Sequence, residues 1–211
     1  MKHLIIIGAR GFGREVYNIA LKSRGYNIDY DIKGFLDDKT DALDGYNGYP
    51  PIIDSVESYK PCENDVFICA LGDVNYKKKY ADLILSKGGK FVSLVHKSAQ
   101  ISQNTVLGVG CIVGYYANIS CDIKIGDFVT LQPFTEIGHD AEIGEYCHLN
   151  TYSFVGGYAR IGRMTTIHTG AIILPHMVIG DNSVVGAGSV ITRNIPSNVT
   201  TFVTPARIIS I

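Results

Sequence analysis

The chain has 211 residues, enough for two modest domains or one elongated domain. Its 19 basic and 20 acidic side chains leave a net charge of −1, which argues against nucleic acid or an acidic membrane surface as the main partner. No stretch approaches the ~18 apolar residues of a membrane-spanning helix, and no secretory signal precedes Gly8, so we expect neither a span nor export.

The first 96 residues alternate between expected strands and helices. Residues 2–7 are typical of a buried strand, and a glycine turn (residues 8–13) leads from it into a helix that ends near Leu21. Further strands are expected at residues 31–36, 65–71 and 90–95, with a short helix near Ser55 and a longer one over residues 75–86. This alternation predicts an α/β domain over residues 1–96 with a small, Rossmann-like parallel sheet.

The carboxyl ends of these strands carry candidate ligand-binding residues. The turn has the spacing G-x-x-G-x-G, which differs from the G-x-G-x-x-G of dinucleotide folds, so NAD binding is not expected. The helix N-terminus after it presents backbone N–H groups suited to a phosphate. Asp37 and Asp38 end the second strand, where a ribose-binding carboxylate is expected, and Gly72 ends the third. Ordinary turns and a solvated acidic pair are the alternative interpretation.

A six-residue repeat dominates the rest of the chain. Every sixth residue from Ile101 to Ile191 is aliphatic, and the position two residues before each is mostly small. Period six fits neither a helix nor a free strand, so it predicts a solenoid in which three hexads close one triangular coil. The aliphatic residues fill its centre: Ile101, Leu107, Val113, Ile119, Ile125, Leu131, Ile137, Ile143, Leu149, Val155, Ile161, Ile167, Ile173, Ile179, Val185 and Ile191.

The two ends of the solenoid and the five cysteines of the chain lead to further predictions. His96 leads into the repeat without a linker, so the second domain (residues 97–211) should be joined rigidly to the first, and the irregular tail after Ile191 should cap the last coil. The five cysteines show no zinc-type spacing, which predicts no metal site and a reducing cytoplasm.

Two histidines of the repeat are candidates for chemistry. His139 and Asp140 fall on a corner, where an exposed imidazole can accept a proton while the carboxylate fixes its tautomer. The alternative is that His139 is an ordinary surface residue without a role in chemistry. His148 points outward half a coil further on, so the two histidines can share a site only if another subunit closes against this one. His168 and His176 are interpreted as surface residues, with a helper role in a subunit cleft as the minority option.

Hydroxyl nucleophiles and exposed aromatic residues lead to two further predictions. Ser153, Ser183 and Ser189 occupy the inward small position, so they should pack in the core and not act as nucleophiles. Outward-facing aromatic residues are too many for a lone rod in water, which predicts a closed trimer. They are Tyr115, Tyr116, Phe128, Phe134 and Tyr152.

With its strand–glycine turn–helix, its Phe35-Leu36-Asp37-Asp38 run and its His139-Asp140 pair in hexapeptide repeats, the chain resembles the PglD/NeuD family of sugar acetyltransferases over essentially its whole length. The resemblance implies a left-handed parallel β-helix, a homotrimer with active sites between subunits, and a cytoplasmic enzyme. It also implies transfer of acetyl from acetyl-CoA to the amino group of a nucleotide-linked sugar, such as a UDP-4-amino sugar, for surface glycans. Acetylation of a hydroxyl, as in the sialic-acid branch, and a non-catalytic scaffold or sugar-binding module are the alternatives.

The resemblance also assigns residues. It implies His139 as the catalytic base and Asp140 as the group that makes it more basic. Acetyl-CoA would contact His148, Gly157, Thr169 and Ala187. The nucleotide sugar would contact Arg10, Gly11, Phe12, Asp37, Asp38 and Gly72. Two departures bear on specificity: some relatives carry a histidine where Phe12 stands, and the tail reads Val203-Thr204-Pro205-Ala206-Arg207, in which Arg207 could meet the coenzyme's 3'-phosphate.

Overall fold

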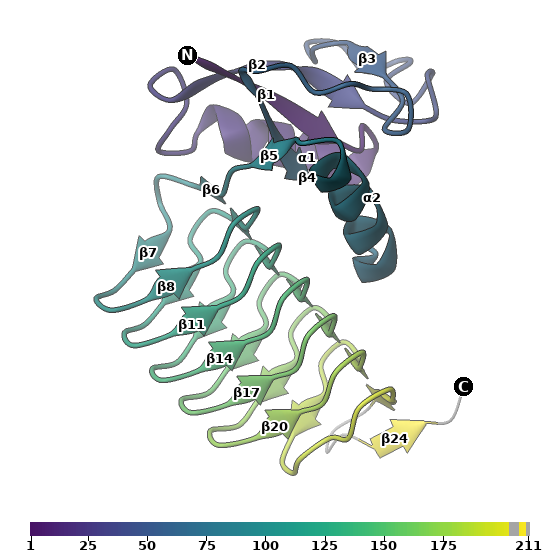
Figure 1. Cartoon of the computed structure of the whole chain (residues 1–211). Coiled ribbons are helices and arrows are strands. Elements are labelled where there is room, and N and C mark those ends of the chain that lie inside the picture. Colours follow the sequence, from purple (N-terminus) through teal and green to yellow (C-terminus); the bar gives the residue numbers. More distant parts are fainter. Residues whose placement is uncertain (203–206, 210–211) are drawn as a thin grey trace.

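The computed structural model describes residues 1–202 and 207–209, so the tail segment Val203–Ala206 discussed above lies outside the described residues. A small α/β domain stands at one end of a long, three-sided prism, and helix α2 leans along the prism's first coils (Figure 1). No helix in the described part of the chain is long and apolar enough to cross a membrane.

The α/β domain has one parallel sheet with the strand order β3-β2-β1-β4-β5. Its strands are β1 (Lys2–Ile7), β2 (Tyr30–Leu36), β3 (Ile52–Asp54), β4 (Asp65–Cys69) and β5 (Lys90–Phe91), and its helices are α1 (Gly11–Leu21) and α2 (Val74–Ser86). Successive β1 side chains point to opposite faces, so Leu4 and Ile6 pack with α1 while Ile5 and Ile7 pack with α2. The helices therefore cover opposite faces, as a parallel sheet requires.

Two expectations for this domain need correction. The short helix predicted near Ser55 is wrong, because β3 occupies residues 52–54 and turns follow it. The single strand predicted over residues 90–95 is divided: β5 pairs with β4, whereas β6 (Leu94–Val95) pairs with β9 (Ile112–Val113) of the prism. The chain thus changes sheets between Phe91 and Leu94, slightly before the expected domain boundary after residue 96.

The prism is the predicted β-solenoid. Along most of the prism, each strand pairs in parallel with the strand 18 residues later, as in Ile119 with Ile137 and Ile137 with Val155. The three sheets are β22-β19-β16-β13-β10-β7, β20-β17-β14-β11-β8 and β24-β23-β21-β18-β15-β12-β9-β6. The two-residue strands are β7 (Gln100–Ile101), β8 (Val106–Leu107), β9 (Ile112–Val113), β10 (Asn118–Ile119), β11 (Lys124–Ile125), β12 (Thr130–Leu131), β13 (Glu136–Ile137), β14 (Glu142–Ile143), β15 (His148–Leu149), β16 (Phe154–Val155), β17 (Arg160–Ile161), β18 (Thr166–Ile167), β19 (Ile172–Ile173), β20 (Val178–Ile179), β21 (Val184–Val185) and β22 (Val190–Ile191).

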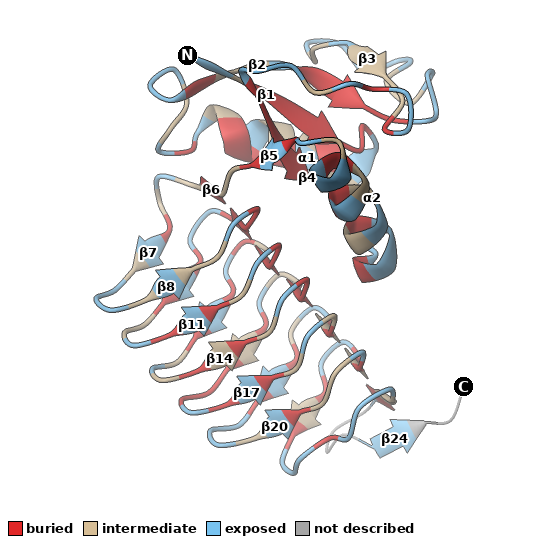
Figure 2. Ribbon diagram, viewed as in Figure 1, coloured by how far each residue is buried: buried red, intermediate tan, exposed pale blue. Residues whose placement is uncertain are grey.

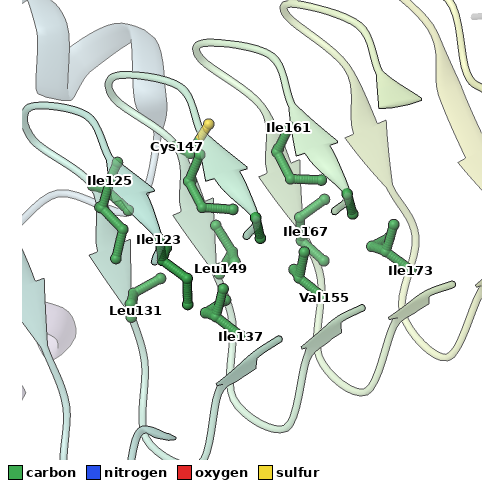
Figure 3. Packing of buried hydrophobic residues seen from close by; sticks show 14 of the residues in the cluster. Ile123, Ile125, Leu131, Ile137, Cys147, Leu149, Val155, Ile161, Ile167 and Ile173 are labelled. Carbon is green, nitrogen blue, oxygen red and sulfur yellow. The ribbon is translucent and has the colours of Figure 1, made fainter. Parts of the chain in front are cut away.

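The repeat positions form the core of the prism. The aliphatic residues stack in columns along its axis, and the small residues fill the spaces beside them (Figure 3). Ser153, Ser183 and Ser189 are buried there, which confirms that they pack in the core. In the prism, burial concentrates on the inside and on the side next to the α/β domain, and the sheet of the α/β domain forms a second buried region (Figure 2). At the far end, β23 (Thr200–Phe202) pairs with β21, and the antiparallel β24 (Arg207–Ile209) extends that sheet.

One corner of the prism is docked against the α/β domain. Phe128, expected on an outward face, is only 5% exposed because it stacks on Tyr146 and meets the edge of Phe91. Lys77 of α2 is fully buried beside this corner, and its Nζ donates to the carbonyls of Phe128 and Cys147 and to the hydroxyl of Thr130. Burial lowers the pKa of Lys77 to about 8. These contacts fix α2 to the coil that carries His148.

Candidate functional site

A cavity of about 440 Å³ opens at the carboxyl ends of β1, β2 and β4. Five of the six residues expected to bind the nucleotide sugar line it: Arg10, Phe12, Asp37, Asp38 and Gly72. Gly11 lies between two lining residues but is not itself part of the wall. A cavity of this size and position matches the usual ligand site of an open parallel sheet.

The N-terminus of α1 faces this cavity. Its N-cap, Arg10, makes no side-chain capping hydrogen bond, so the first N–H groups of the helix keep their donors for a ligand. Gly13 allows the helix to start this close to β1, because a Cβ on Gly13 would stand 2.0 Å from the carbonyl oxygen of Gly8. The turn therefore forms a cradle suited to a phosphate group, with the guanidinium of Arg10 beside it.

The two acidic residues have different environments. Asp37 accepts a hydrogen bond of 2.8 Å from the backbone N–H of Ala9, which braces the glycine turn, and one of 2.9 Å from the backbone N–H of Lys39, which braces its own loop. Asp38 is exposed, and it accepts a hydrogen bond of 2.7 Å from the hydroxyl of Tyr80. This hydrogen bond raises the pKa of Tyr80 to about 12. Of the two carboxylates, Asp38 is the exposed one, and Tyr80 engages one of its two oxygens.

Sequence reasoning missed the aromatic wall of the cavity. Tyr76 and Tyr80 of α2 line it and stack on each other with ring centroids 6.5 Å apart. Their spacing of four residues places them on one face of the helix that follows Gly72 and Asp73. The sequence feature that could have predicted this wall is the pair of tyrosines four residues apart in the helix that follows Gly72.

His139 stands on the corner between β13 and β14. Its Nδ1 lies 2.9 Å from a carboxylate oxygen of Asp140, and its side chain is 55% exposed. The ring lies against Gly157 and meets the face of Tyr158 edge-on, with the ring centroids 5.2 Å apart. His176 stacks on Tyr158, with the ring centroids 4.9 Å apart. The imidazole is thus oriented by three neighbours, while its Nε2 has no hydrogen-bond partner from them.

His148 is covered by the α/β domain. It points away from the prism axis as predicted, yet it is only 2% exposed, because Phe12 packs edge-on against its ring and Gly72 lies beside it. Its Nε2 lies 3.1 Å from the carboxamide nitrogen of Gln132. Burial, then the positive charge of Lys77 and a small effect of His168, holds the pKa of His148 well below its usual value. His148 is therefore a neutral imidazole between the cavity and the prism.

The residues expected to bind acetyl-CoA lie on two different edges of the prism. His139 and Gly157 belong to one edge, where Tyr158 N–H donates to the His139 carbonyl. Thr169 and Ala187 belong to another, which also carries Thr151. The sheet of β13, β16, β19 and β22 separates the two edges. One chain does not bring all of these residues together. No group of three or more His, Cys, Asp or Glu side chains among the described residues is arranged to hold a metal.

The fold and the site define a class, the hexapeptide-repeat β-solenoids with an added α/β domain that carries a ligand cavity. Residues 3–84 match the PglD N-terminal domain family, and residues 122–157 and 158–193 match the bacterial transferase hexapeptide family. The chain belongs to the PglD-like family of hexapeptide-repeat proteins.

Three known proteins illustrate the likeness. UDP-N-acetylbacillosamine N-acetyltransferase of Bacillus subtilis is 31% identical over 117 residues, which are 54% of this chain and 51% of that protein, so the match spans about half the length of this relative. PerB from Caulobacter crescentus, solved with CoA and GDP-perosamine, is 25% identical with a TM-score of 0.88, covering 100% of this chain and 98% of that one. WeeI from Acinetobacter baumannii is 26% identical with a TM-score of 0.86, covering 99% and 100%.

Proposed function

We propose that the protein is an N-acetyltransferase that moves the acetyl group of acetyl-CoA to the amino group of a nucleotide-linked sugar for surface-glycan synthesis. The observation that carries the proposal is the oriented His139–Asp140 pair on the prism corner. The names of the relatives support it, since one is a nucleotide-sugar N-acetyltransferase and another was solved with CoA and a nucleotide-linked sugar. Five free cysteines favour a reducing compartment, and we place the enzyme in the cytoplasm.

The α/β domain holds the nucleotide part of the acceptor. The open N-terminus of α1 and the guanidinium of Arg10 suit the diphosphate, since both favour negative charge. Asp38 is free to accept hydrogen bonds from a ribose, whereas Asp37 is occupied by the backbone. Phe12 and Gly72 lie between this cavity and His148, so the sugar would extend toward His148 from the diphosphate.

His139 supplies the base. Its free Nε2 accepts a proton from the sugar amine as the nitrogen forms a bond to the acetyl carbon. Asp140, at Nδ1, stabilises the positively charged imidazolium that results. As the carbon–sulfur bond breaks, His139 returns the proton to the departing CoA thiolate. Hydrogen-bond donors from the Gly157 backbone or from His148 would stabilise the negative charge that develops on the acetyl oxygen.

The complete site requires a second copy of the chain. The two edges that carry His139 and Thr169 meet only if prisms pack side by side, which favours a cyclic trimer. The sheet between those edges is suited to this packing, because Phe154, Ile172 and Val190 follow each other in register on it. A ladder of stacked rings, Tyr116, Phe134 and Tyr152, lies along its border. Sedimentation showing a stable monomer at micromolar concentration would contradict this arrangement.

A substrate panel tests the function. The purified protein is incubated with acetyl-CoA and UDP- or GDP-linked sugars that carry either a free amine or only hydroxyls, and products are identified by mass spectrometry. We expect acetylation of an amino sugar. Acetylation of hydroxyls alone would favour the O-acetyltransferase alternative, and isothermal titration without heat for either substrate would indicate a scaffold.

A further inference from the structure

His148 is held at one ring nitrogen and unpaired at the other. Its Nε2 lies 3.1 Å from the side-chain nitrogen of Gln132, whereas its buried Nδ1 has no hydrogen-bond partner within the described part of the chain. A buried N–H without an acceptor costs about 1–3 kcal/mol. Such groups are rare in native proteins, and each calls for a specific explanation, such as a catalytic role.

The orientation of Gln132 determines which nitrogen of His148 carries the proton. In the structure the hydroxyl of Thr151 donates to the Gln132 carboxamide oxygen at 3.0 Å, and the carboxamide nitrogen is directed at His148. A carboxamide nitrogen can only donate. The Nε2 atom of His148 must therefore accept, and in a neutral imidazole the proton then lies on Nδ1.

We infer that Gln132, oriented by Thr151, is a positioning residue that holds His148 as the tautomer protonated on Nδ1, so that His148 donates a hydrogen bond to the acetyl oxygen and does not act as a base. The inference rests on the proposed function, in which His139 is the base. It assigns a separate role to each histidine: His139 removes the proton, and His148 stabilises the acetyl oxygen. The unpaired Nδ1–H is the donor, and the ligand oxygen is its missing acceptor.

The surroundings of His148 are consistent with a neutral donor. The charged and titratable groups that act on its ring are Lys77 and His168, and both disfavour a second proton. Phe12 and Gly72, which pack against the ring, also line the nucleotide cavity. Gln132 and Thr151 line a separate cleft of about 580 Å³ between α1 and the prism. His148 thus lies between residues of the two openings, since Gln132 and Thr151 line one and Phe12 and Gly72 line the other.

Nitrogen-15 NMR of the histidine-labelled protein tests the tautomer directly. The His148 signals are assigned by their loss in His148→Gln. We expect the wild-type ring to carry its proton on Nδ1. In Gln132→Glu the carboxylate accepts instead of donating, so the proton should move to Nε2 or the ring should hold both protons. Gln100→Glu, the same change at an exposed position of β7, is the matched control and should leave the His148 signals unchanged.

Kinetics test the consequence. Gln132→Glu should lower kcat by about 10²–10³-fold, the usual effect of losing one oxyanion donor, with KM for both substrates within about threefold. Thr151→Val should give a smaller loss, and Thr151→Ser, which keeps the hydroxyl, should restore the rate. If Gln132→Glu does not fold, Gln132→Met takes its place and should leave the His148 tautomer mixed.

Two results would overturn the inference. One is that His148 in the wild-type protein carries its proton on Nε2. The other is that the Gln132 variant that folds keeps the His148 signals and the kcat of the wild type. Failure of the proposed function looks different. In that case the wild-type protein acetylates no amino sugar at all, while the tautomer measurement still decides what Gln132 does.

Discussion

The imidazole of His139 lies where a side chain at Gly157 would be. A Cβ built on Gly157 would stand 2.9 Å from Cε1 and 3.0 Å from Nε2 of His139. Because the two residues are 18 positions apart, they occupy the same place on successive coils. The glycine therefore leaves room for the ring, and the repeat brings the two residues together.

Gly157→Ala should impair catalysis without unfolding the protein. The added methyl group must push the imidazole aside, since it approaches only the far end of a flexible side chain. Displacement of a catalytic group by about 1 Å can reduce the rate about 10²-fold, so we expect a fall of that order in kcat. The melting temperature should remain close to that of the wild type. A normal kcat with a lowered melting temperature would show that Gly157 serves only the fold.

Asp37 and Asp38 should respond differently to the same substitution. Asp38→Asn removes a charged acceptor from the cavity and should raise KM for the nucleotide sugar about tenfold or more, because such a hydrogen bond contributes about 1.5–3 kcal/mol. Acetyl-CoA affinity should be unchanged. Asp37→Asn should instead lower the free energy of unfolding by about 1–3 kcal/mol, since one backbone N–H loses its acceptor. Equal weakening of both substrates in Asp38→Asn would contradict the assignment of Asp38.

Phe128 and Tyr116 lie on two different surfaces of the prism, so matched substitutions to alanine can distinguish the roles of those surfaces. Phe128→Ala should lower the free energy of unfolding by about 3–5 kcal/mol, because the ring is buried under the α/β domain. Tyr116 is 62% exposed in the single chain, so Tyr116→Ala should cost little there but should weaken the proposed trimer. Denaturant titration and sedimentation separate the two effects. A stable trimer with Tyr116→Ala would place the interface elsewhere.

The buried His148 predicts a loss of stability in mild acid. Burial depresses the pKa of His148 in the folded state far below the unfolded value of 6.5. Below pH 6.5 the unfolded chain then binds a proton that the folded chain does not, so stability falls as the pH falls through this range. This linkage lowers the stability progressively between pH 7 and pH 5. His148→Gln should lose less stability than the wild type over that interval, and equal losses would contradict the buried neutral state.

The sequence predicted the prism in detail because its repeat is local. Each hexad specifies its own strand, corner and inward residue, and every aliphatic position from Val113 to Ile191 is buried. The orientation of His139 at its corner and its pairing with Asp140 follow from the same periodicity. In the α/β domain the glycine turn and the positions of Asp38 and Gly72 also followed from strand ends, which are local signals.

The remaining features depend on contacts between distant parts of the chain. Periodicity does not say which corner the α/β domain covers, so Phe128 and His148 appeared exposed although Phe91 and Phe12 of that domain pack on them. Lys77 looked like an ordinary helix residue, because its three acceptors lie more than fifty positions away. The sequence of residues 90–95 shows no break in its strand-like pattern. The strand is divided because its first part pairs with the sheet of the α/β domain and its last part pairs with the prism.

The rate of acetyl transfer by His139→Ala, compared with His176→Ala, tests the central claim most directly. Both histidines are exposed on the same edge of the prism, and both contact Tyr158. Steady-state assays at pH 7 with acetyl-CoA and the amino sugar should show kcat reduced by ~10²–10⁴-fold in His139→Ala, the range for a positioned base. His176→Ala should stay within about threefold of the wild type. A near-normal kcat in His139→Ala would contradict the assignment of the base.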